Sequence, residues 1–158
     1  MPTIDVIGDI HGHADKLRAL LSRLGYEQSG GVYGSPDRRA IFIGDLIDRG
    51  PAIGEVIEIV AGMLRAGAAQ IVMGNHEFSA LGYHTPDGKG EYLRQHTSKN
   101  HTQHEKTLTY FKENPGAKDR ALKWFYSFAG PALLESVRDR RGECPWRQSP
   151  SLSPYQQR

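Results

Sequence analysis

The sequence has little cysteine and no long apolar run, and each absence excludes a class of protein. Cys144 is the single cysteine among 158 residues, so no disulfide can form within the chain, which fits a cytosolic protein. No apolar run approaches the roughly 18–20 residues that a transmembrane helix needs. The first residues lack the basic segment and long apolar block of a signal peptide. These absences predict a cytoplasmic protein with no membrane partner.

Charge of one sign is not in excess either. The chain has 20 lysines and arginines against 18 aspartates and glutamates, which gives a net charge of +2. A balance this close gives no argument for nucleic acid as a partner. The sequence also has no internal repeat at solenoid spacing. With 38% apolar residues, the length predicts one domain with a real core.

Three short apolar runs each end in a glycine that is followed by polar side chains. They read VIGDIHG at 6–12, IFIGDLIDRGP at 41–51 and IVMGNHE at 71–77. Each pattern is typical of a buried strand that runs out into a polar loop. The proline at the end of the second run is placed to open a helix. We therefore expect three strands that deliver Asp, His or Asn side chains to one edge of a sheet.

The segments between these runs have helical periodicity. Leucines at 17–24 fall at helical spacing before Gly25, and a second apolar stripe at 53–64 ends before Gly67. Residues 28–37 are rich in glycine and predict a surface loop. The order strand–helix–strand–helix–strand with short connections predicts an α/β fold. Its strands should be parallel, its crossovers right-handed, and helices should cover the sheet.

Four polar side chains should then meet where the parallel strands end. In open α/β sheets a ligand sits outside the carboxyl ends of the strands, and Asp9, His11, Asp45 and Asn75 follow those ends. Oxygen and imidazole ligands together suit divalent metals such as Mn, Fe or Zn. A carboxylate between two such ions can bridge them, and paired ions stabilise both the attacking and the leaving oxygen of a phosphoryl displacement.

At these residues the chain resembles a known family. GDIHG at 8–12, GDLIDRG at 44–50 and GNHE at 74–77 are similar to the first three motifs of the calcineurin-like metallophosphoesterases, in the right order. The Asp-Arg-Gly of the middle motif resembles the serine/threonine phosphoprotein phosphatase branch and its bacterial relatives. The resemblance covers roughly residues 3–80. It implies a β-sandwich flanked by helices, of which this chain would hold the N-terminal half.

The resemblance implies two divalent metal ions and their ligands. Asp9 and His11 would hold the first ion, Asp45 would bridge both, and Asn75 would ligate the second. Taken singly, an Asp or Asn after a strand is often only a turn or cap residue. The three motifs together argue against that interpretation here.

The resemblance also implies the catalytic residues. Arg49 would grip the substrate phosphate, because its planar fork matches two phosphate oxygens. His76 would protonate the leaving oxygen, and Asp48 would hold that imidazole oriented and charged. The nucleophile would be a metal-bound hydroxide. The alternative for Asp48 and Arg49 is a surface ion pair of little energetic value.

Four histidines follow the third motif, at 84, 96, 101 and 104. His-rich tracts can bind metal, but the polar flanks at 100–106 favour the solvated face of a helix. His13 is interpreted as a helix-start residue rather than a ligand. Residues 117–128 predict an aromatic helix that packs into the core.

The last stretch departs from the family pattern. The family needs two further histidines on later strands, but residues 136–158 hold five arginines, three prolines and no histidine. This composition predicts an irregular or disordered basic tail after a partial domain at 1–135, with a partner-binding arm as the alternative. We therefore expect a C-terminally truncated chain, a fragment or a frameshift product, with an incomplete second metal site. An exposed sheet would then favour self-association.

Three functions stay open at this stage. The first is a metal-dependent hydrolase of phosphate monoesters on phosphoprotein-type substrates, impaired by the missing ligands. The second is a symmetrical dinucleoside-tetraphosphate hydrolase of the same superfamily. The intact Asp48–Arg49 pair and Glu77 favour the first, because in the second we expect the pair to be replaced and an Asp in place of Glu77. The third is a metal-binding or interaction remnant without catalysis.

Overall fold

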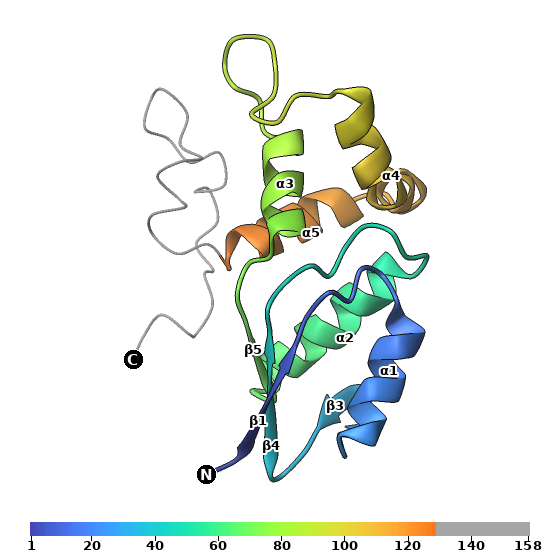
Figure 1. Ribbon diagram of the computed structural model, residues 1–158, viewed down its shortest axis with the longest axis vertical. Coiled ribbons are helices and arrows are strands. Elements are labelled where there is room, and N and C mark those ends of the chain that lie inside the picture. Colours follow the sequence, from blue (N-terminus) through green and yellow to red (C-terminus); the bar gives the residue numbers. More distant parts are fainter. Residues whose placement is uncertain (129–158) are drawn as a thin grey trace.

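The computed structural model describes residues 1–128 (Figure 1), which form a three-stranded parallel sheet, a small hairpin and five helices. The sheet has the strand order β1 (Thr3–Ile7), β4 (Arg38–Phe42), β5 (Ala69–Ile71). Ile7 of β1 pairs with Phe42 of β4, which in turn pairs with Ile71 of β5. The predicted parallel strand–helix–strand–helix–strand core is confirmed. None of the helices in these residues has the length and apolar character that crossing a bilayer requires.

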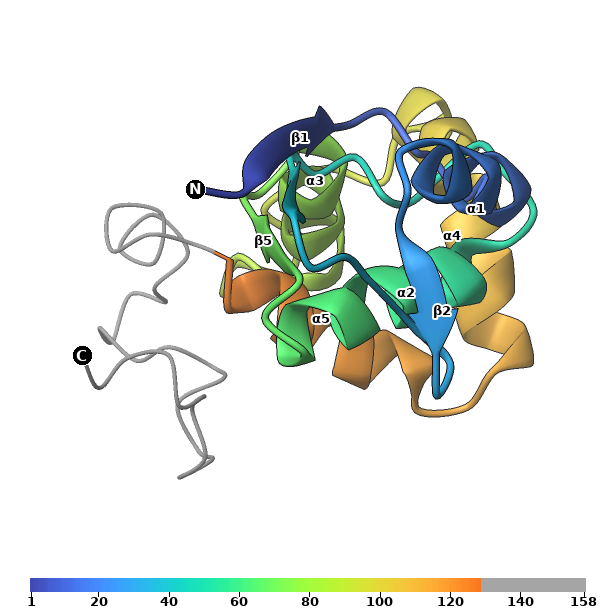
Figure 2. The ribbon, with the colours of Figure 1, turned by 90° about the horizontal axis from the view of Figure 1, so that it is seen from below.

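Helices α1 (Ala14–Arg23) and α2 (Ile53–Arg65) lie together on one side of the sheet (Figure 2). Their apolar stripes are buried, and Leu21, Val56 and Val60 are wholly inaccessible together with Phe42 of the sheet. Burial of this apolar surface is the main source of stability for the part of the molecule formed by the sheet, α1 and α2.

The opposite face of the sheet is uncovered within the described residues. Ile4, Val6, Ile43 and Val72 expose between 46% and 65% of their surface. An apolar sheet face in contact with water is a common site of association. Self-association of this chain stays a prediction.

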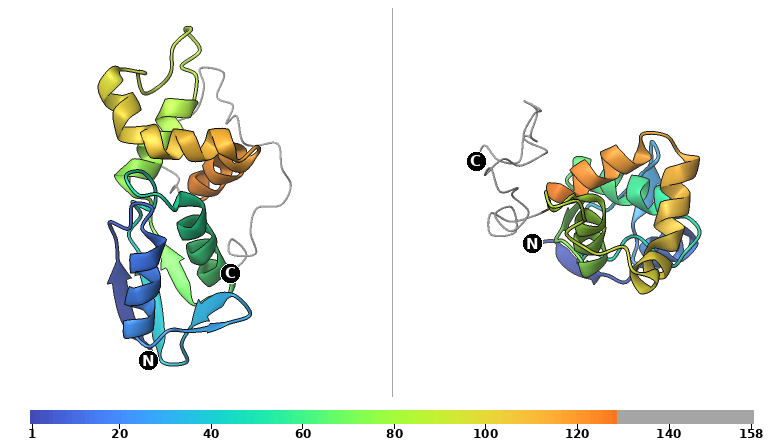
Figure 3. Two further views of the ribbon diagram at one scale, coloured as in Figure 1. Left: turned by 90° about the vertical axis from the view of Figure 1, so that its right-hand side faces the viewer. Right: turned by 90° about the horizontal axis from the view of Figure 1, so that it is seen from above.

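Three further helices, α3 (Asn75–His84), α4 (Ser98–Glu113) and α5 (Ala117–Tyr126), stand above the carboxyl ends of the strands (Figure 3). Phe125 and Leu122 of α5 are buried in the common core, so the predicted packing role of the aromatic helix is confirmed. The site therefore lies between a sheet half and a helical half.

Residues 28–37 were predicted as a surface loop, and this was wrong. They contribute to an antiparallel hairpin of β2 (Glu27–Ser29) and β3 (Val32–Gly34). Gly30 and Gly31 both have positive φ, 57° and 84°, which is the two-residue turn that matches strand twist. Tyr33 is 7% exposed and joins the core. The predicted domain boundary at 135 and the tail at 136–158 lie outside the described residues.

Candidate active site

Two loops, one after β1 and one after β4, hold an unusual backbone. Among the described residues, the five non-glycine positions with positive φ are Asp9, His11, Asp45, Asp48 and Arg49, with φ between 46° and 69°. Residues other than glycine rarely adopt this backbone conformation, because it costs on the order of 1–3 kcal/mol per residue. Residues that do adopt it are often found at functional sites. All five are residues that the sequence analysis assigned to metal, phosphate or catalysis.

Backbone hydrogen bonds fix the two loops to one another. His11 N donates to the Asp45 carbonyl and Gly12 N to the Leu46 carbonyl, both over 2.8 Å, and Gly50 N donates back to the His11 carbonyl over 2.8 Å. Gly44 also has positive φ, 79°, and a Cβ there would collide with the backbone of Gly74. The glycines of the motifs therefore allow three chain segments to approach closely.

His11 has the geometry of a metal ligand. Its Nδ1 donates to the Ile47 carbonyl over 3.0 Å, which leaves a lone pair on Nε2. Nε2 is buried without a hydrogen-bond partner and lies 3.5 Å from Oδ1 of Asp9. A buried imidazole nitrogen without a partner is costly, and a metal ion would satisfy it. A backbone acceptor that fixes the other ring nitrogen is typical of metal-bound histidine.

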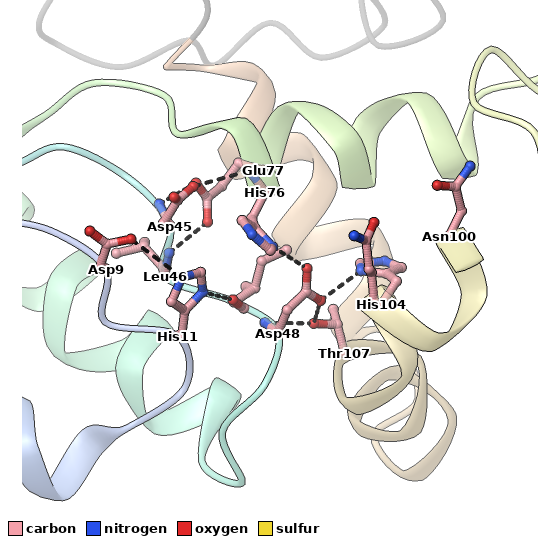
Figure 4. Close-up of polar contacts among 12 residues, drawn as sticks. Asp9, His11, Asp45, Leu46, Asp48, His76, Glu77, Asn100, His104 and Thr107 are labelled. Atoms are coloured by element: carbon pink, nitrogen blue, oxygen red, sulfur yellow. Dashed lines mark hydrogen bonds and ion pairs between the residues drawn. The ribbon is translucent and has the colours of Figure 1, made fainter. Parts of the chain in front are cut away.

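Asp45 stands at the centre of the cluster (Figure 4). One ligand atom each from His11, Asp45 and His76 lie within 4.8 Å of one another in residues 1–128. The Asn75 amide, with its nitrogen turned toward Asp45, is 3.0 Å and 3.3 Å from the two carboxylate oxygens. This donor set of carboxylates, imidazole and amide fits the divalent ions expected from the sequence. The structure brings Asp9, His11, Asp45 and Asn75 together.

His76 fits an acid better than a ligand, although it belongs to that cluster. Its Nδ1 lies 2.6 Å from Oδ2 of Asp48, and this hydrogen bond raises the pKa of His76 although partial burial opposes it. A metal ligand must be a neutral imidazole. A raised pKa instead favours the charged ring, which can donate a proton.

Asp48 is the most heavily bonded side chain of the site (Figure 4). It is 2% exposed and accepts hydrogen bonds from His76 at 2.6 Å, His104 Nδ1 at 2.8 Å and Thr107 Oγ1 at 2.6 Å. Burial alone would favour the neutral acid, but these three donors hold the pKa of Asp48 well below its usual range. The alternative of a surface ion pair with Arg49 is wrong, because Asp48 is buried and paired with histidines.

His104 corrects the prediction of a fully solvated helix face at 100–106. It is 2% exposed and turns inward from α4, although its neighbours on the helix are mostly exposed. Its Nε2 lies 3.3 Å from Nε2 of His84, and burial lowers the pKa of His84 to about 4, with the nearby charge of His104 adding to the effect. The apolar side of α4 at Phe111 and Thr107 falls on the same face, a spacing that could have identified His104.

Glu77 is a second residue whose position the sequence analysis did not assign. It is wholly buried and accepts from the backbone N–H of Asp45 at 2.7 Å and of Leu46 at 2.8 Å. Burial raises the pKa of Glu77, and those two backbone donors partly oppose the shift. Glu77 therefore ties the third motif to the loop that carries Asp45.

Comparison with known proteins gives curated relatives by sequence and, separately, neighbours by structure. An asymmetrical bis(5'-nucleosyl)-tetraphosphatase, PrpE, from Halalkalibacterium halodurans is 49% identical over 73 residues, which cover 46% of this chain and 30% of the relative. PrpE of Bacillus subtilis is 48% identical over 73 residues with the same coverage. The match thus spans about a third of the length of these curated relatives. The phosphoprotein substrate expected from the resemblance is not confirmed by these names.

A structural neighbour supports the fold. A protein serine/threonine phosphatase from Saccharomyces cerevisiae with similarity to human phosphatase PP5 superposes with a TM-score of 0.50 at 17% identity. The superposition covers 80% of this chain and 33% of that chain. The family model of the calcineurin-like phosphoesterases matches residues 2–148. Because that match takes in nearly the whole chain, the protein belongs to the calcineurin-like phosphoesterase family.

Proposed function

We propose that this chain carries the metal-binding and phosphate-binding half of a hydrolase that cleaves dinucleoside tetraphosphates asymmetrically. The single observation behind the proposal is the convergence of Asp9, His11, Asp45 and Asn75 on one point, beside the buried His76–Asp48 pair. The choice of substrate is supported by the names of the PrpE relatives.

The chain's own residues would divide the work as follows. Arg49 is exposed beside His76 in one cleft, where its guanidinium can bind two oxygens of the phosphate under attack. His76 would give its proton to the oxygen that leaves. Asp48 keeps the ring oriented and charged through the 2.6 Å hydrogen bond.

Divalent ions at Asp9, His11, Asp45 and Asn75 would supply positive charge to the transferring phosphate and acidify the attacking water. Asp9, His11 and Asp45 would supply three donors to one ion. Asp45 and Asn75 would supply two to a second. An ion held by two protein donors should bind more weakly than one held by three.

Product analysis tests the proposal directly. The full chain is incubated with Mn²⁺ and diadenosine tetraphosphate, an aryl phosphate or a phosphopeptide, and the products are separated by ion exchange. We expect ATP and AMP from the tetraphosphate, in larger amount than hydrolysis of the other two substrates. Two molecules of ADP would indicate symmetrical cleavage and contradict the proposal.

One variant, studied in the same assay, separates catalysis from metal binding. His76→Ala should lower turnover by about two to four orders of magnitude, the range of a lost general acid, with little change in metal content. A chain that binds metal and hydrolyses none of the three substrates would be the non-catalytic remnant, and the proposal would fall.

The second candidate is hydrolysis of phosphate monoesters. It is favoured by Asp48 and Glu77, which keep the pattern of the phosphatase branch and are both buried in specific hydrogen bonds. Faster release of phosphate from the aryl phosphate or the phosphopeptide than from the tetraphosphate would favour this candidate.

A further inference from the structure

We propose that the cleft between α3 and α4 is a polyphosphate-binding subsite, in which Arg94 and Lys106 hold the phosphates that follow the one bound at Arg49. The inference rests on the proposed function and names residues for the part of the substrate beyond the reacting phosphate. Neither Arg94 nor Lys106 belongs to the three sequence motifs.

The cleft is continuous with the reacting centre. It has a volume of about 440 Å³, within the usual size of small-ligand sites. His76, Arg49 and Asn75 line it together with Arg94 and Lys106. Residues of both α3 and α4 line the cleft, and Figure 4 shows how the two helices lie, with His76 labelled on α3 and Asn100 and His104 on α4. An extended ligand bound at Arg49 therefore has α4 beside it.

Arg94 is held in place without losing its charge. Its Nη2 donates to the side-chain oxygens of Gln103 at 2.9 Å and Asn100 at 3.2 Å, and its backbone N–H donates to the Gly82 carbonyl over 3.0 Å. These partners are neutral amides, so the guanidinium charge is not compensated. A pre-positioned arginine loses less entropy when it binds a phosphate than a mobile one does.

The charges along the cleft favour an anion. Within residues 1–128, no carboxylate lies within 4 Å of the side-chain nitrogens of Arg49, Arg94 or Lys106. Asp48 also lines the cleft, but its charge is engaged by His76, His104 and Thr107. Glu105 is the remaining carboxylate of the lining. Three cations against one free carboxylate suit a chain of phosphates better than a single monoester.

Binding to metal-free protein tests the subsite without turnover. Tripolyphosphate, ATP and inorganic phosphate are titrated into the full chain by calorimetry in the presence of EDTA. We expect Arg94→Ala and Lys106→Ala each to lower the affinity for tripolyphosphate and for ATP by about tenfold, which corresponds to the loss of one good ionic contact. Inorganic phosphate is expected to contact Arg49 alone, so its affinity should fall by less than about twofold.

Two exposed cations outside the cleft, Lys112 of α4 and Arg120 of α5, are matched controls. Their alanine variants should bind tripolyphosphate like the wild type. Because Arg94 also bonds to Asn100 and Gln103, Arg94→Lys is included. It keeps the charge and should recover part of the affinity, whereas a purely structural defect would not be recovered.

Four results would overturn the subsite. The first three are unchanged tripolyphosphate affinity in both cleft variants, an equal loss of affinity in Lys112→Ala, and a loss confined to ATP, which would mean that the two cations contact the nucleoside rather than the phosphates. A phosphopeptide that depends on Arg94 and Lys106 more strongly than tripolyphosphate does would also overturn it. Failure of tetraphosphate hydrolysis would contradict the proposed function alone, since this binding assay involves no reaction.

Discussion

His104 Nδ1 lies 2.8 Å from Oδ1 of Asp48, and the two residues are 56 positions apart in the chain. Thr107, one turn further along α4, bonds to the same carboxylate oxygen at 2.6 Å and accepts the Asp48 backbone N–H at 3.1 Å. Helix α4 therefore supports the side chain that orients His76. The site depends on a part of the chain that lies beyond the three motifs.

Removal of this support should cost stability. In His104→Ala the buried Asp48 loses one of three donors, and we expect the free energy of unfolding to fall by about 1–3 kcal/mol. Urea unfolding followed by circular dichroism gives the value. Lys99→Ala, at an exposed position of the same helix, should cost less. Equal losses in the two variants would contradict the role of His104.

Asp48 should control the protonation of His76. In Asp48→Asn the hydrogen bond to the carboxylate, which is the main cause of the raised pKa, is lost, so the pKa of His76 should fall. Nuclear magnetic resonance titration of the His76 ring, compared between wild type and variant, measures the change. An unchanged pKa would show that another group holds the proton on His76.

His84 predicts a pH dependence of stability. Its pKa is about 4 in the folded chain against an ordinary value of 6.5, so between these values the unfolded chain takes up a proton that the folded chain does not. Stability should therefore fall as the pH falls through this window. We expect a loss of about 1–2 kcal/mol from pH 7 to pH 5 due to His84.

The wild type and His84→Gln are compared by urea unfolding at both pH values, because His76 contributes in the opposite direction. Its raised pKa gives stability that is present below 6.5 and lost as the pH rises through the folded value. The difference between the two proteins isolates His84. If the two proteins had the same pH dependence of stability, the pKa of His84 would not be lowered in the folded chain.

Glu77 should matter for metal binding although it is not a proposed ligand. In Glu77→Ala the backbone N–H groups of Asp45 and Leu46 lose their acceptor, so the loop that carries Asp45 loosens. We expect Mn²⁺ affinity to weaken by about 10–100-fold, as for other supporting residues of metal sites. Calorimetric titration with Mn²⁺ measures it. Glu58→Ala, an exposed change on α2, should leave the affinity unchanged.

The sheet half of the fold could be predicted because local pattern and tertiary structure agree there. Apolar runs that end in glycine at Gly8, Gly44 and Gly74 mark the strand ends, and the helical stripes between them determine parallel pairing. The hairpin was missed because Gly30 and Gly31 were interpreted as loop composition. A pair of glycines between two short polar strands is also a tight-turn signal, and Tyr33 was the apolar residue that it placed in the core.

The candidate site was predictable in its residue types and only partly in its connections. Asp9, His11 and Asp45 follow strand ends, so parallel topology alone brings them to one edge. His104 follows no such rule, because its contact with Asp48 depends on how α4 packs across the strand ends. Periodicity within α4 places His104 on the inner face, but it does not show which distant side chain lies there.

Metal content per chain is the measurement that tests the central claim most directly. We compare the wild type with Asp45→Ala and with the exposed control Asp119→Ala. Each protein is incubated with Mn²⁺, separated from unbound ion by gel filtration and analysed by inductively coupled plasma mass spectrometry. We expect at least about one ion per chain in the wild type and the control, and a loss of bound ion in Asp45→Ala, because Asp45 is proposed to hold both ions. Full metal content in Asp45→Ala would contradict the account.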